Sequence, residues 1–363
     1  MNPVLPIVSM ITVVTVASNA NFQSVIDDYR ESQGIPGISA VVIRDNDVIF
    51  SGASGMADLA TSREMTANTV FYIGSLTKVL TAVLTLNLIE AGKLSLVDTV
   101  DMIAADVDDA AVAVSVSHLL THSSGLPREG NFDYWFTADF PSQHDLEDYL
   151  RTAELDFSPG TDRQYSNVGY AALGPVIENA SGQSYSDALR TRVLEPLRMR
   201  TAGSPGPASD VANGYSPPGR IIPSEEKPFA GIGEKTGDRY VRMYHDAGAM
   251  TPAFGVYASA LDLSRLARFL LDYGGDDVLS KNMRAQMRNQ QANGWGLGLK
   301  VQLYKGHRVA RHDGWFAAHR SHLILDARDG IAVVVLTNGD NANPTEIAEA
   351  LFDAALETDT MAK

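Results

Sequence analysis

The sequence of 363 residues contains no cysteine. Disulfide bonds, thiolate metal sites and cysteine nucleophiles are therefore excluded, and the eight histidines are the only soft metal ligands left. Positive charge is also scarce, because 29 Lys and Arg stand against 44 Asp and Glu, for a formal net charge of −15. Nucleic-acid phosphates and anionic lipids repel so acidic a chain, so we expect neither as a partner. The 45% share of hydrophobic residues excludes a disordered protein, and the length suffices for about two domains.

The first 20 residues are ambiguous. Residues 4–17 are apolar, but they fall short of the roughly 20 residues that a membrane-spanning helix needs, so we expect no stable membrane span. The small residues Ser18-Asn19-Ala20 follow, which predicts that residues 1–20 are a cleaved export signal and that the protein is periplasmic or secreted. No Lys or Arg precedes the run, and Pro3 and Pro6 interrupt it. The alternative is an N-terminal segment packed on the fold of a cytoplasmic protein.

The hydrophobic pattern predicts strands near both ends of the chain. Near the start, a helix is expected over residues 22–33, and a hairpin follows, in which the β-branched runs 38–44 and 48–51 flank Asp45-Asn46-Asp47. Near the end, four strand-like runs lie between two helical segments. The runs are 296–303, 308–311, 321–326 and 331–338, and the helices are 261–271 and 344–357.

The middle of the chain is predicted to be mainly helical. Residues 75–91 form a helix that is apolar on nearly every face, so we expect it to be buried at the centre of the protein. Residues 115–199 continue the helical pattern, broken by loops. Residues 201–239 are rich in proline and glycine, which indicates an irregular excursion or lid.

Strands at both ends and helices between them predict a mixed α/β (α+β) fold. We expect one antiparallel sheet flanked by helices, with a mostly helical domain inserted into it. The sheet domain would comprise residues 21–70 and 240–363, and the helical domain residues 71–239. The cleft between the two is the natural place for a small-molecule site.

Ser75-Leu76-Thr77-Lys78 is the first pattern that carries chemistry. On a helix, side chains three residues apart share a face, so the Ser75 hydroxyl and the Lys78 amine can form a hydrogen bond. A serine becomes a nucleophile when a base takes its proton, and a lysine whose pKa is lowered by burial can be that base. Unpaired N–H groups at the helix start would also favour an oxyanion near Ser75. Residues 224–227 repeat the spacing beside two glutamates, and we interpret them as a solvated turn.

Tyr165-Ser166-Asn167 lies on a predicted loop that enters a helix near Val168. The Tyr165 hydroxyl could relay a proton to a leaving group if nearby cations lower its pKa. Asn167 could hold a substrate carbonyl or position Lys78. Alone, such a segment is an ordinary helix entry, and it gains weight only from the other motifs.

His312-Asp313-Gly314 ends one of the strand runs and is followed by Trp315. A histidine at this place could donate a hydrogen bond to the substrate or bind its carboxylate. Gly314 would let the substrate backbone approach closely, since it has no Cβ.

Ser-x-x-Lys, Tyr-x-Asn and His-x-Gly, in this order, resemble the serine β-lactamase and penicillin-binding protein superfamily. The similar branch is the class C type, with class C β-lactamases, D-alanyl-D-alanine carboxypeptidases, D-aminopeptidases and family VIII carboxylesterases. The resemblance runs from about residue 35 to residue 338 and implies a β-lactamase/transpeptidase-like fold. Further similar stretches are 119–126, 247–250 leading into 261–263, and 295–299.

The resemblance implies a role for each catalytic residue. Ser75 would be the nucleophile and Lys78 the neighbouring base. Tyr165 would be a second base or acid, and Asn167 would bind the substrate and join the hydrogen-bond network. The backbone N–H groups of Ser75 and Trp315 would form the oxyanion hole. No metal or organic cofactor is implied.

The third segment is expected to bind the substrate through His312, Gly314 and Trp315. His312 stands where class C β-lactamases have a lysine, so the permanent cation for a drug's carboxylate is missing and an efficient β-lactamase is disfavoured. Arg311 and Ala318 stand where many relatives have glycine.

Two further histidines, His118 and His122, are interpreted as structural. His118 and His122 have a spacing that can bind zinc, but no glutamate follows His118, so the zinc-protease pattern fails. His319 and His322 are expected to flank the site or to lie at the surface.

The sequence therefore predicts a serine hydrolase that forms an acyl-enzyme with an amide or ester. A peptidase or amidase of D-amino-acid type, similar to a D-Ala-D-Ala carboxypeptidase, is the leading prediction, with a small molecule or short peptide as substrate. The alternatives are a carboxylesterase, a class C-type β-lactamase, a penicillin-binding sensor or scaffold without turnover, and acyl transfer to an alcohol or amine.

Overall fold

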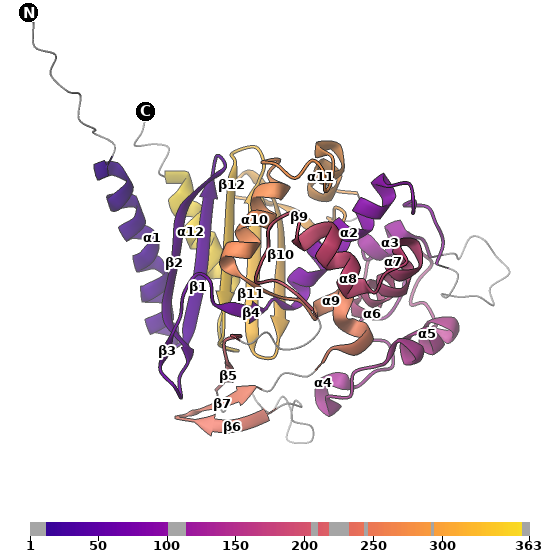
Figure 1. Cartoon of the computed structure of the whole chain (residues 1–363), viewed down its shortest axis with the longest axis horizontal. Coiled ribbons are helices and arrows are strands. Elements are labelled where there is room, and N and C mark those ends of the chain that lie inside the picture. Colours follow the sequence, from indigo (N-terminus) through magenta and orange to yellow (C-terminus); the bar gives the residue numbers. More distant parts are fainter. Residues whose placement is uncertain are drawn as a thin grey trace, which may run out of the picture.

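The computed structural model in Figure 1 describes residues 12–100, 114–204, 210–217, 232–242, 246–291 and 294–357. The side chains of residues 1–20, the predicted signal segment, lie outside this description, and so does the second Ser-x-x-Lys at 224–227. Within these ranges, no helix has both the length and the hydropathy that crossing a bilayer requires.

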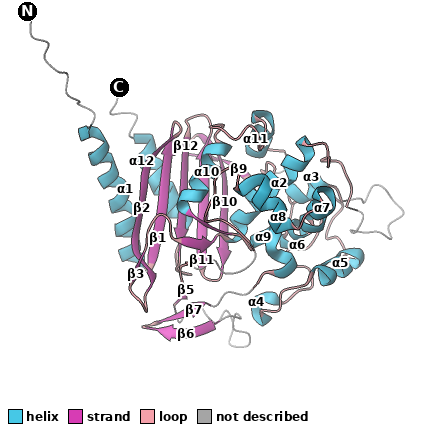
Figure 2. Ribbon diagram, in the orientation of Figure 1, coloured by secondary structure: helices cyan, strands magenta, loops and turns pink. Residues whose placement is uncertain are grey.

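One side of the molecule is a seven-stranded antiparallel sheet, drawn in magenta in Figure 2. The strand order is β3-β2-β1-β12-β11-β10-β9, so the two ends of the chain meet at its centre, where Val41 of β1 lies opposite Val334 of β12. The predicted fold class is confirmed. The strands are β1 Gly37–Arg44, β2 Asp47–Asp58, β3 Arg63–Glu64, β9 Lys300–Tyr304, β10 His307–Phe316, β11 His319–Asp326 and β12 Ile331–Thr337.

The predicted strands are present, and their ends shift for local reasons. Asp45 and Asn46 form the hairpin turn with φ values of +46° and +75°, the left-handed geometry that suits a tight hairpin. β9 begins at Lys300 and not at 296, because the chain first turns at Gly298, whose φ is +88°. A Cβ on that glycine would lie 2.5 Å from the Cβ of Ala82, so the turn packs directly on the central helix.

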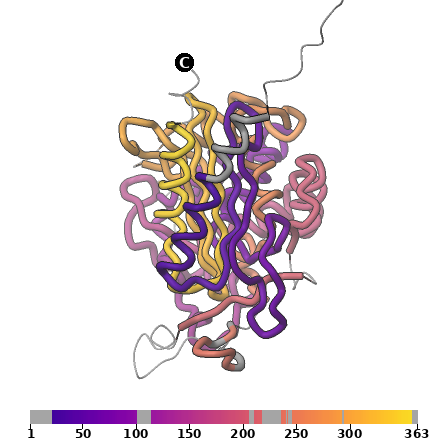
Figure 3. The backbone as a smooth tube through the Cα atoms, turned by 90° about the vertical axis from the view of Figure 1, so that its left-hand side faces the viewer, coloured from indigo at the N-terminus to yellow at the C-terminus, as the bar shows by residue number. Residues whose placement is uncertain are grey.

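Helices cover both faces of the sheet. α1 (Thr12–Gln33) and α12 (Pro344–Glu357) lie side by side on one face, as the view in Figure 3 shows. α1 begins ten residues before the predicted start at 22. Phe22, Ile26, Leu351 and Phe352 from these helices are buried against apolar side chains of the sheet. α10 (Ala260–Leu270) packs on the opposite face, against β1 and β12.

A layer of helices lies beyond α10, to the right in Figure 1. At its centre is α2 (Thr77–Glu90), which is buried along almost its whole length, as its apolar sequence predicts. The short helical turn η1 (Gly74–Leu76) precedes it, so Ser75 lies in this turn and not in the helix itself. The other helices are α3 Val116–Leu120, α4 Tyr134–Thr137, α5 Gln143–Thr152, α6 Asn167–Ala171, α7 Leu173–Ser181, α8 Tyr185–Leu189, η3 Arg190–Leu194, η5 Gly248–Met250, α9 Thr251–Phe254 and α11 Lys281–Arg288.

The proline- and glycine-rich segment is more regular than expected where it is described. β5 (Gly214–Ser216), β6 (Ile232–Thr236) and β7 (Arg239–Arg242) form a small antiparallel sheet. The prediction of an irregular excursion over residues 201–239 is therefore wrong for these strands. A further two-stranded sheet joins β4 (Val70–Tyr72), which leads to η1, to β8 (Tyr257–Ser259), which follows α9.

Candidate active site

Ser75 lies where the helical layer meets β10. The backbone on either side is held closely: a Cβ on Gly74 would lie 2.4 Å from the backbone nitrogen of Trp315, and Gly74 has a φ of +53°. A Cβ on Gly314 would lie 2.1 Å from the carbonyl oxygen of Ile73 and 3.0 Å from the Ser75 nitrogen. These two glycines therefore bring the backbone nitrogens of Ser75 and Trp315 to adjacent positions, because no other residue type permits so close an approach.

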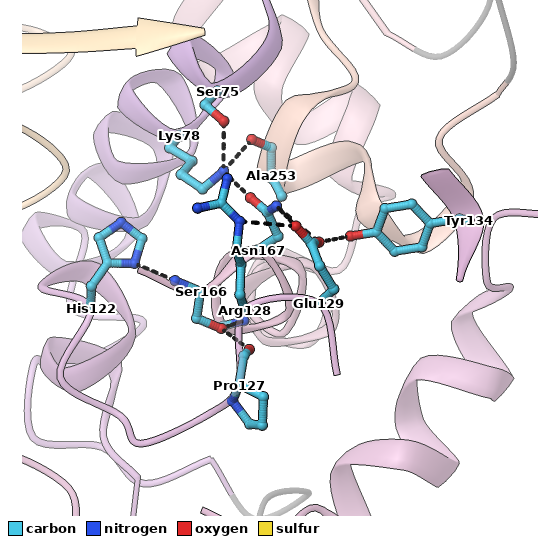
Figure 4. Close-up of polar contacts among 11 residues, drawn as sticks. Ser75, Lys78, His122, Pro127, Arg128, Glu129, Tyr134, Ser166, Asn167 and Ala253 are labelled. Atoms are coloured by element: carbon cyan, nitrogen blue, oxygen red, sulfur yellow. Dashed lines mark hydrogen bonds and ion pairs between the residues drawn. The ribbon is translucent and has the colours of Figure 1, made fainter. Parts of the chain in front are cut away.

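Lys78 is fully buried one turn after Ser75. Its Nζ donates to the Asn167 side-chain oxygen at 2.7 Å and to the Ala253 carbonyl at 2.8 Å, and it lies 3.2 Å from the Ser75 Oγ (Figure 4). Burial holds the pKa of Lys78 well below its usual range, and the charge of Glu129 opposes that shift. A neutral amine has two N–H donors and one lone pair. In the neutral form, with these two donors engaged, the lone pair would face the serine hydroxyl; in the ammonium form the third N–H donates to the Ser75 Oγ.

Tyr165 reaches the same point from the loop before α6. Ser166 caps that helix, since its Oγ accepts a hydrogen bond from Gly169 N at 2.8 Å. The Tyr165 side chain lies close enough to the Ser75 side chain to influence its own ionisation, and Lys78 Nζ lies 4.9 Å from the centre of the Tyr165 ring. The condition that nearby cations lower the pKa of Tyr165 is not met, because burial dominates and raises that pKa. The phenol is therefore neutral near pH 7 and keeps its proton.

His312 on β10 is buried behind Tyr165, with their ring centres 6.2 Å apart. Its Nδ1 lies 2.7 Å from the Asp313 carbonyl oxygen, which makes it the protonated nitrogen. Burial lowers the pKa of His312 to about 4. The histidine is neutral near pH 7, and substrate binding by His312, Gly314 and Trp315 stays a prediction. Its Nε2 has no hydrogen-bond partner among the described residues.

Sequence reasoning missed the residues that surround Asn167. The Asn167 Nδ2 donates to both carboxylate oxygens of Glu129, at 2.9 and 3.0 Å. Glu129 also accepts a hydrogen bond from the Tyr134 hydroxyl and pairs with Arg128 Nε at 3.1 Å. The segment that carries Glu129 follows directly on residues 119–126, one of the stretches that support the resemblance. That adjacency was the available signal.

The sequence matches the model of the beta-lactamase family over residues 22–357. The chain belongs to the beta-lactamase family. It is 31% identical to penicillin-binding protein 4 of Amycolatopsis lactamdurans, over 88% of this chain and 85% of that protein. It is 28% identical to esterase EstB of Burkholderia gladioli, over 88% and 90% of the two chains.

A solved D-amino acid amidase from Ochrobactrum anthropi SV3 has the same fold. Its TM-score is 0.80 at 23% identity, and the match covers 95% of this chain and all of that one. This member of the beta-lactamase family is therefore a serine hydrolase of the β-lactamase and penicillin-binding protein superfamily.

The other histidines of this beta-lactamase family member have structural contacts. His118 Nδ1 accepts a hydrogen bond from Ser115 N at 3.2 Å, and His122 Nδ1 accepts one from Ser166 N at 3.2 Å. His319 and His322 are both buried, so the expectation of a surface position is wrong for them. Each lies on β11, one strand away from β10.

One group of side chains in the described ranges has atoms close enough together to hold a metal ion, namely His307, Asp326 and Asp329. The His307 Nδ1 lies 3.1 Å from Asp326 and 2.8 Å from Asp329. A hydrogen bond from the Nδ1–H of the ring to the carboxylates accounts for this arrangement.

The buried histidines predict that acid destabilises the fold. Burial lowers the pKa of His319 to about 4 and that of His322 to about 3. Below about pH 6.5 these two histidines become protonated in the unfolded chain but stay neutral in the folded protein. The free energy of unfolding therefore falls as the pH drops from 6.5 toward 4. Each histidine contributes a slope that approaches about 1.4 kcal/mol per pH unit. Urea unfolding at pH 7.0, 6.0 and 5.0 gives the free energy of unfolding at each pH and hence this slope.

The His319→Gln variant is expected to have a weaker pH dependence than the wild type. His144→Gln is the matched control, since His144 is exposed on α5 and its replacement should leave the slope unchanged. Equal slopes for wild type and His319→Gln would contradict this account.

Proposed function

We propose that this serine hydrolase cleaves amide or ester bonds through an acyl-enzyme on Ser75, as an amidase or peptidase of D-amino-acid type. The observation that carries the proposal is the 3.2 Å contact between Lys78 Nζ and the Ser75 Oγ, with the Tyr165 side chain beside both residues. Hydroxyl, amine and phenol are the groups that acyl transfer needs: a nucleophile, a base and a proton donor.

In the acylation step, the Lys78 lone pair takes the Ser75 proton while Oγ forms a bond to the substrate carbonyl carbon. The carbonyl oxygen becomes an oxyanion, which the backbone N–H groups of Ser75 and Trp315 stabilise. As the carbonyl re-forms, the bond to the leaving amine or alcohol breaks. Tyr165 gives its proton to that leaving group and recovers one from the Lys78 ammonium. Water then attacks the ester and releases the acid, with proton transfers in the reverse sense.

The proposed oxyanion hole predicts that Gly314→Ala inactivates the enzyme. The new Cβ would press on the Ile73 carbonyl and on the Ser321 Oγ, 2.3 Å away, and so push the backbone of β10 from η1. We expect kcat to fall by about 100-fold or more, because removing one oxyanion donor has that effect elsewhere. Gly306→Ala, in the turn between β9 and β10, is the control. No atom lies within 4 Å of its Cβ position, and the backbone strain at its φ of +87° would fall on the turn and not on the proposed oxyanion hole, so kcat of the folded variant should match the wild type. Wild-type kcat in purified, folded Gly314→Ala would refute the assignment.

The choice of substrate class rests on two observations. The neutral His312 supplies no permanent cation for a carboxylate, which disfavours a β-lactamase. Trp135 of α4 and Trp315 lie with ring centres 5.1 Å apart, both half-buried, beside the proposed oxyanion hole. Such an aromatic wall suits an apolar or aromatic side chain. The relatives include an esterase and, in fold, a D-amino acid amidase, so we rank the amidase first and the carboxylesterase second.

A substrate panel tests this ranking. We would compare kcat/KM for D-phenylalanine amide, L-phenylalanine amide, p-nitrophenyl butyrate, a D-alanyl-D-alanine peptide and a chromogenic cephalosporin. The proposal expects the D-amide to exceed the L-amide by at least about tenfold, a difference of about 1.4 kcal/mol in transition-state binding. Turnover of the ester with no turnover of either amide would establish the carboxylesterase. Stoichiometric acylation without turnover would establish the sensor.

The remaining predictions on partners belong to the same proposal. A small molecule or short peptide fits the position of Ser75 at the junction of sheet and helical layer, and the net charge of −15 disfavours nucleic acid. A periplasmic or secreted location stays a prediction.

A further inference from the structure

We infer that Glu129 is a positioning residue, whose carboxylate holds the Asn167 side chain with its oxygen toward the Lys78 amine. The inference rests on the proposed function of Ser75 and Lys78 and adds a residue that the motifs do not include. It concerns one question, namely what decides which end of the Asn167 amide faces the base.

The two ends of an asparagine amide have nearly the same shape but opposite hydrogen-bonding capacity. Here the oxygen faces a donor, Lys78 Nζ at 2.7 Å, and the nitrogen faces the acceptors of Glu129 at 2.9 and 3.0 Å. Turning the amide over would set its oxygen against the carboxylate and its N–H groups against those of the amine. Both contacts would then be repulsive in a buried place, where unmatched polar groups are costly. The carboxylate thus selects one orientation.

Glu129 is itself held in place from two directions (Figure 4). Tyr134, which is buried on α4, donates its hydroxyl proton to the carboxylate. Arg128 pairs with it through Nε at 3.1 Å, and the Arg128 carbonyl accepts a hydrogen bond from Asn167 N at 2.7 Å. Asn167 is therefore hydrogen-bonded both to the backbone of this segment, at Arg128, and to the side chain of Glu129. A group that is itself fixed by its neighbours can fix the orientation of another group.

The same carboxylate also sets the charge around the amine. The charged side chains that act on Lys78 are Glu129 and Asp313, which favour the ammonium form, and Arg128, which disfavours it. The rings of Tyr165 and Tyr170 lie 4.9 and 5.6 Å from Nζ. His122 and His312, the titratable groups behind these rings, are neutral near pH 7. Loss of Glu129 would therefore leave the ammonium with less support.

The test compares Glu129→Gln with Glu129→Asp. A glutamine can face Asn167 with its oxygen or with its NH2 group, so it no longer selects the orientation, whereas aspartate remains an acceptor only. We expect kcat for Glu129→Gln to fall by about 10- to 100-fold, as for small misplacements of catalytic groups, with KM within about threefold of the wild type. The loss in log kcat relative to the wild type should be smaller for Glu129→Asp than for Glu129→Gln by at least about a third. Glu154→Gln, an exposed change of the same charge, should have no effect.

The pH dependence of kcat/KM separates positioning from general loss of structure. Lys78 must be unprotonated to act as the base, so its pKa determines the acidic limb. Glu129→Gln removes a charge that favours the ammonium, so the limb should move to lower pH. Arg128→Gln removes the opposing charge, so the limb should move to higher pH. A merely structural defect would lower the melting temperature and would leave the acidic limb of both variants where it is in the wild type.

Three results would overturn the inference: wild-type kcat in Glu129→Gln, equal kcat in the glutamine and aspartate variants, or an unmoved acidic limb. Failure of the proposed function is visible separately, since a fluorophosphonate probe would then leave Ser75 of the wild type unlabelled. If the wild type is labelled and Glu129→Gln reacts at the same rate, the inference alone is wrong.

Discussion

Replacing Ser75 with alanine is expected to lower kcat/KM by at least about 10,000-fold, because loss of the nucleophile removes the whole acyl-enzyme route. The Ser75 Oγ lies 3.2 Å from Lys78 Nζ, with the Tyr165 side chain beside both residues, so neither of these groups can act without it. The measurement is hydrolysis of the best substrate of the panel, at pH 7.5, with active-site titration to exclude traces of wild-type enzyme.

The chain offers a matched control for Ser75→Ala. Ser224 begins the second Ser-x-x-Lys, which we interpret from the sequence as a solvated turn. Ser224→Ala should therefore retain wild-type kcat/KM. A large loss in Ser224→Ala together with a small one in Ser75→Ala would reverse the assignment. Melting temperatures should stay within about 2 °C of the wild type, because Ser75 is partly exposed and packs little apolar surface.

The second large effect is expected for Lys78→Met. Methionine has nearly the length of lysine and suits a buried position, but it cannot accept the serine proton. We expect kcat to fall by at least about 1,000-fold, in the range for loss of a general base that also activates the nucleophile. The acidic limb of the pH profile should disappear with it. Lys93→Met, on the exposed surface beyond α2, is the control and should leave kcat unchanged.

Labelling kinetics distinguish the role of Lys78 from that of a mere structural support. The variant should react with a fluorophosphonate at least about 100-fold more slowly than the wild type at pH 7, with a smaller difference at pH 10, where hydroxide can replace the base. Wild-type labelling rates in folded Lys78→Met at pH 7 would show that another group activates Ser75.

The motifs predicted the contacts among Ser75, Lys78, Tyr165 and Asn167 because each motif ties its residues to a helix start. A hydroxyl and an amine one turn apart come into contact if the segment is helical. The fold that the motifs imply then places Tyr165 near Ser75. The same reasoning predicted the antiparallel sheet, since β-branched runs at both chain ends need partners. The division into two domains stays a prediction.

What the sequence did not yield depends on burial and on distant neighbours. The pKa of Tyr165 is raised and that of His312 is lowered because both are enclosed, and enclosure is a property of the packed molecule. Glu129 contacts Asn167, and Tyr134 contacts Glu129, only after distant segments of the chain fold together. No spacing rule connects residues that are 38 positions apart in the chain. β9 began later than expected because Gly298 packs on α2, which is again a tertiary contact.

Mass spectrometry of a trapped acyl-enzyme tests the central claim most directly. The protein would be mixed with the best ester or amide of the panel, quenched in acid within milliseconds to seconds, digested and mapped. The account predicts an added acyl mass on the peptide that contains Ser75, absent in Ser75→Ala and long-lived in Lys78→Met where any forms. An acyl mass on a different residue, or turnover at full rate in Ser75→Ala, would contradict it.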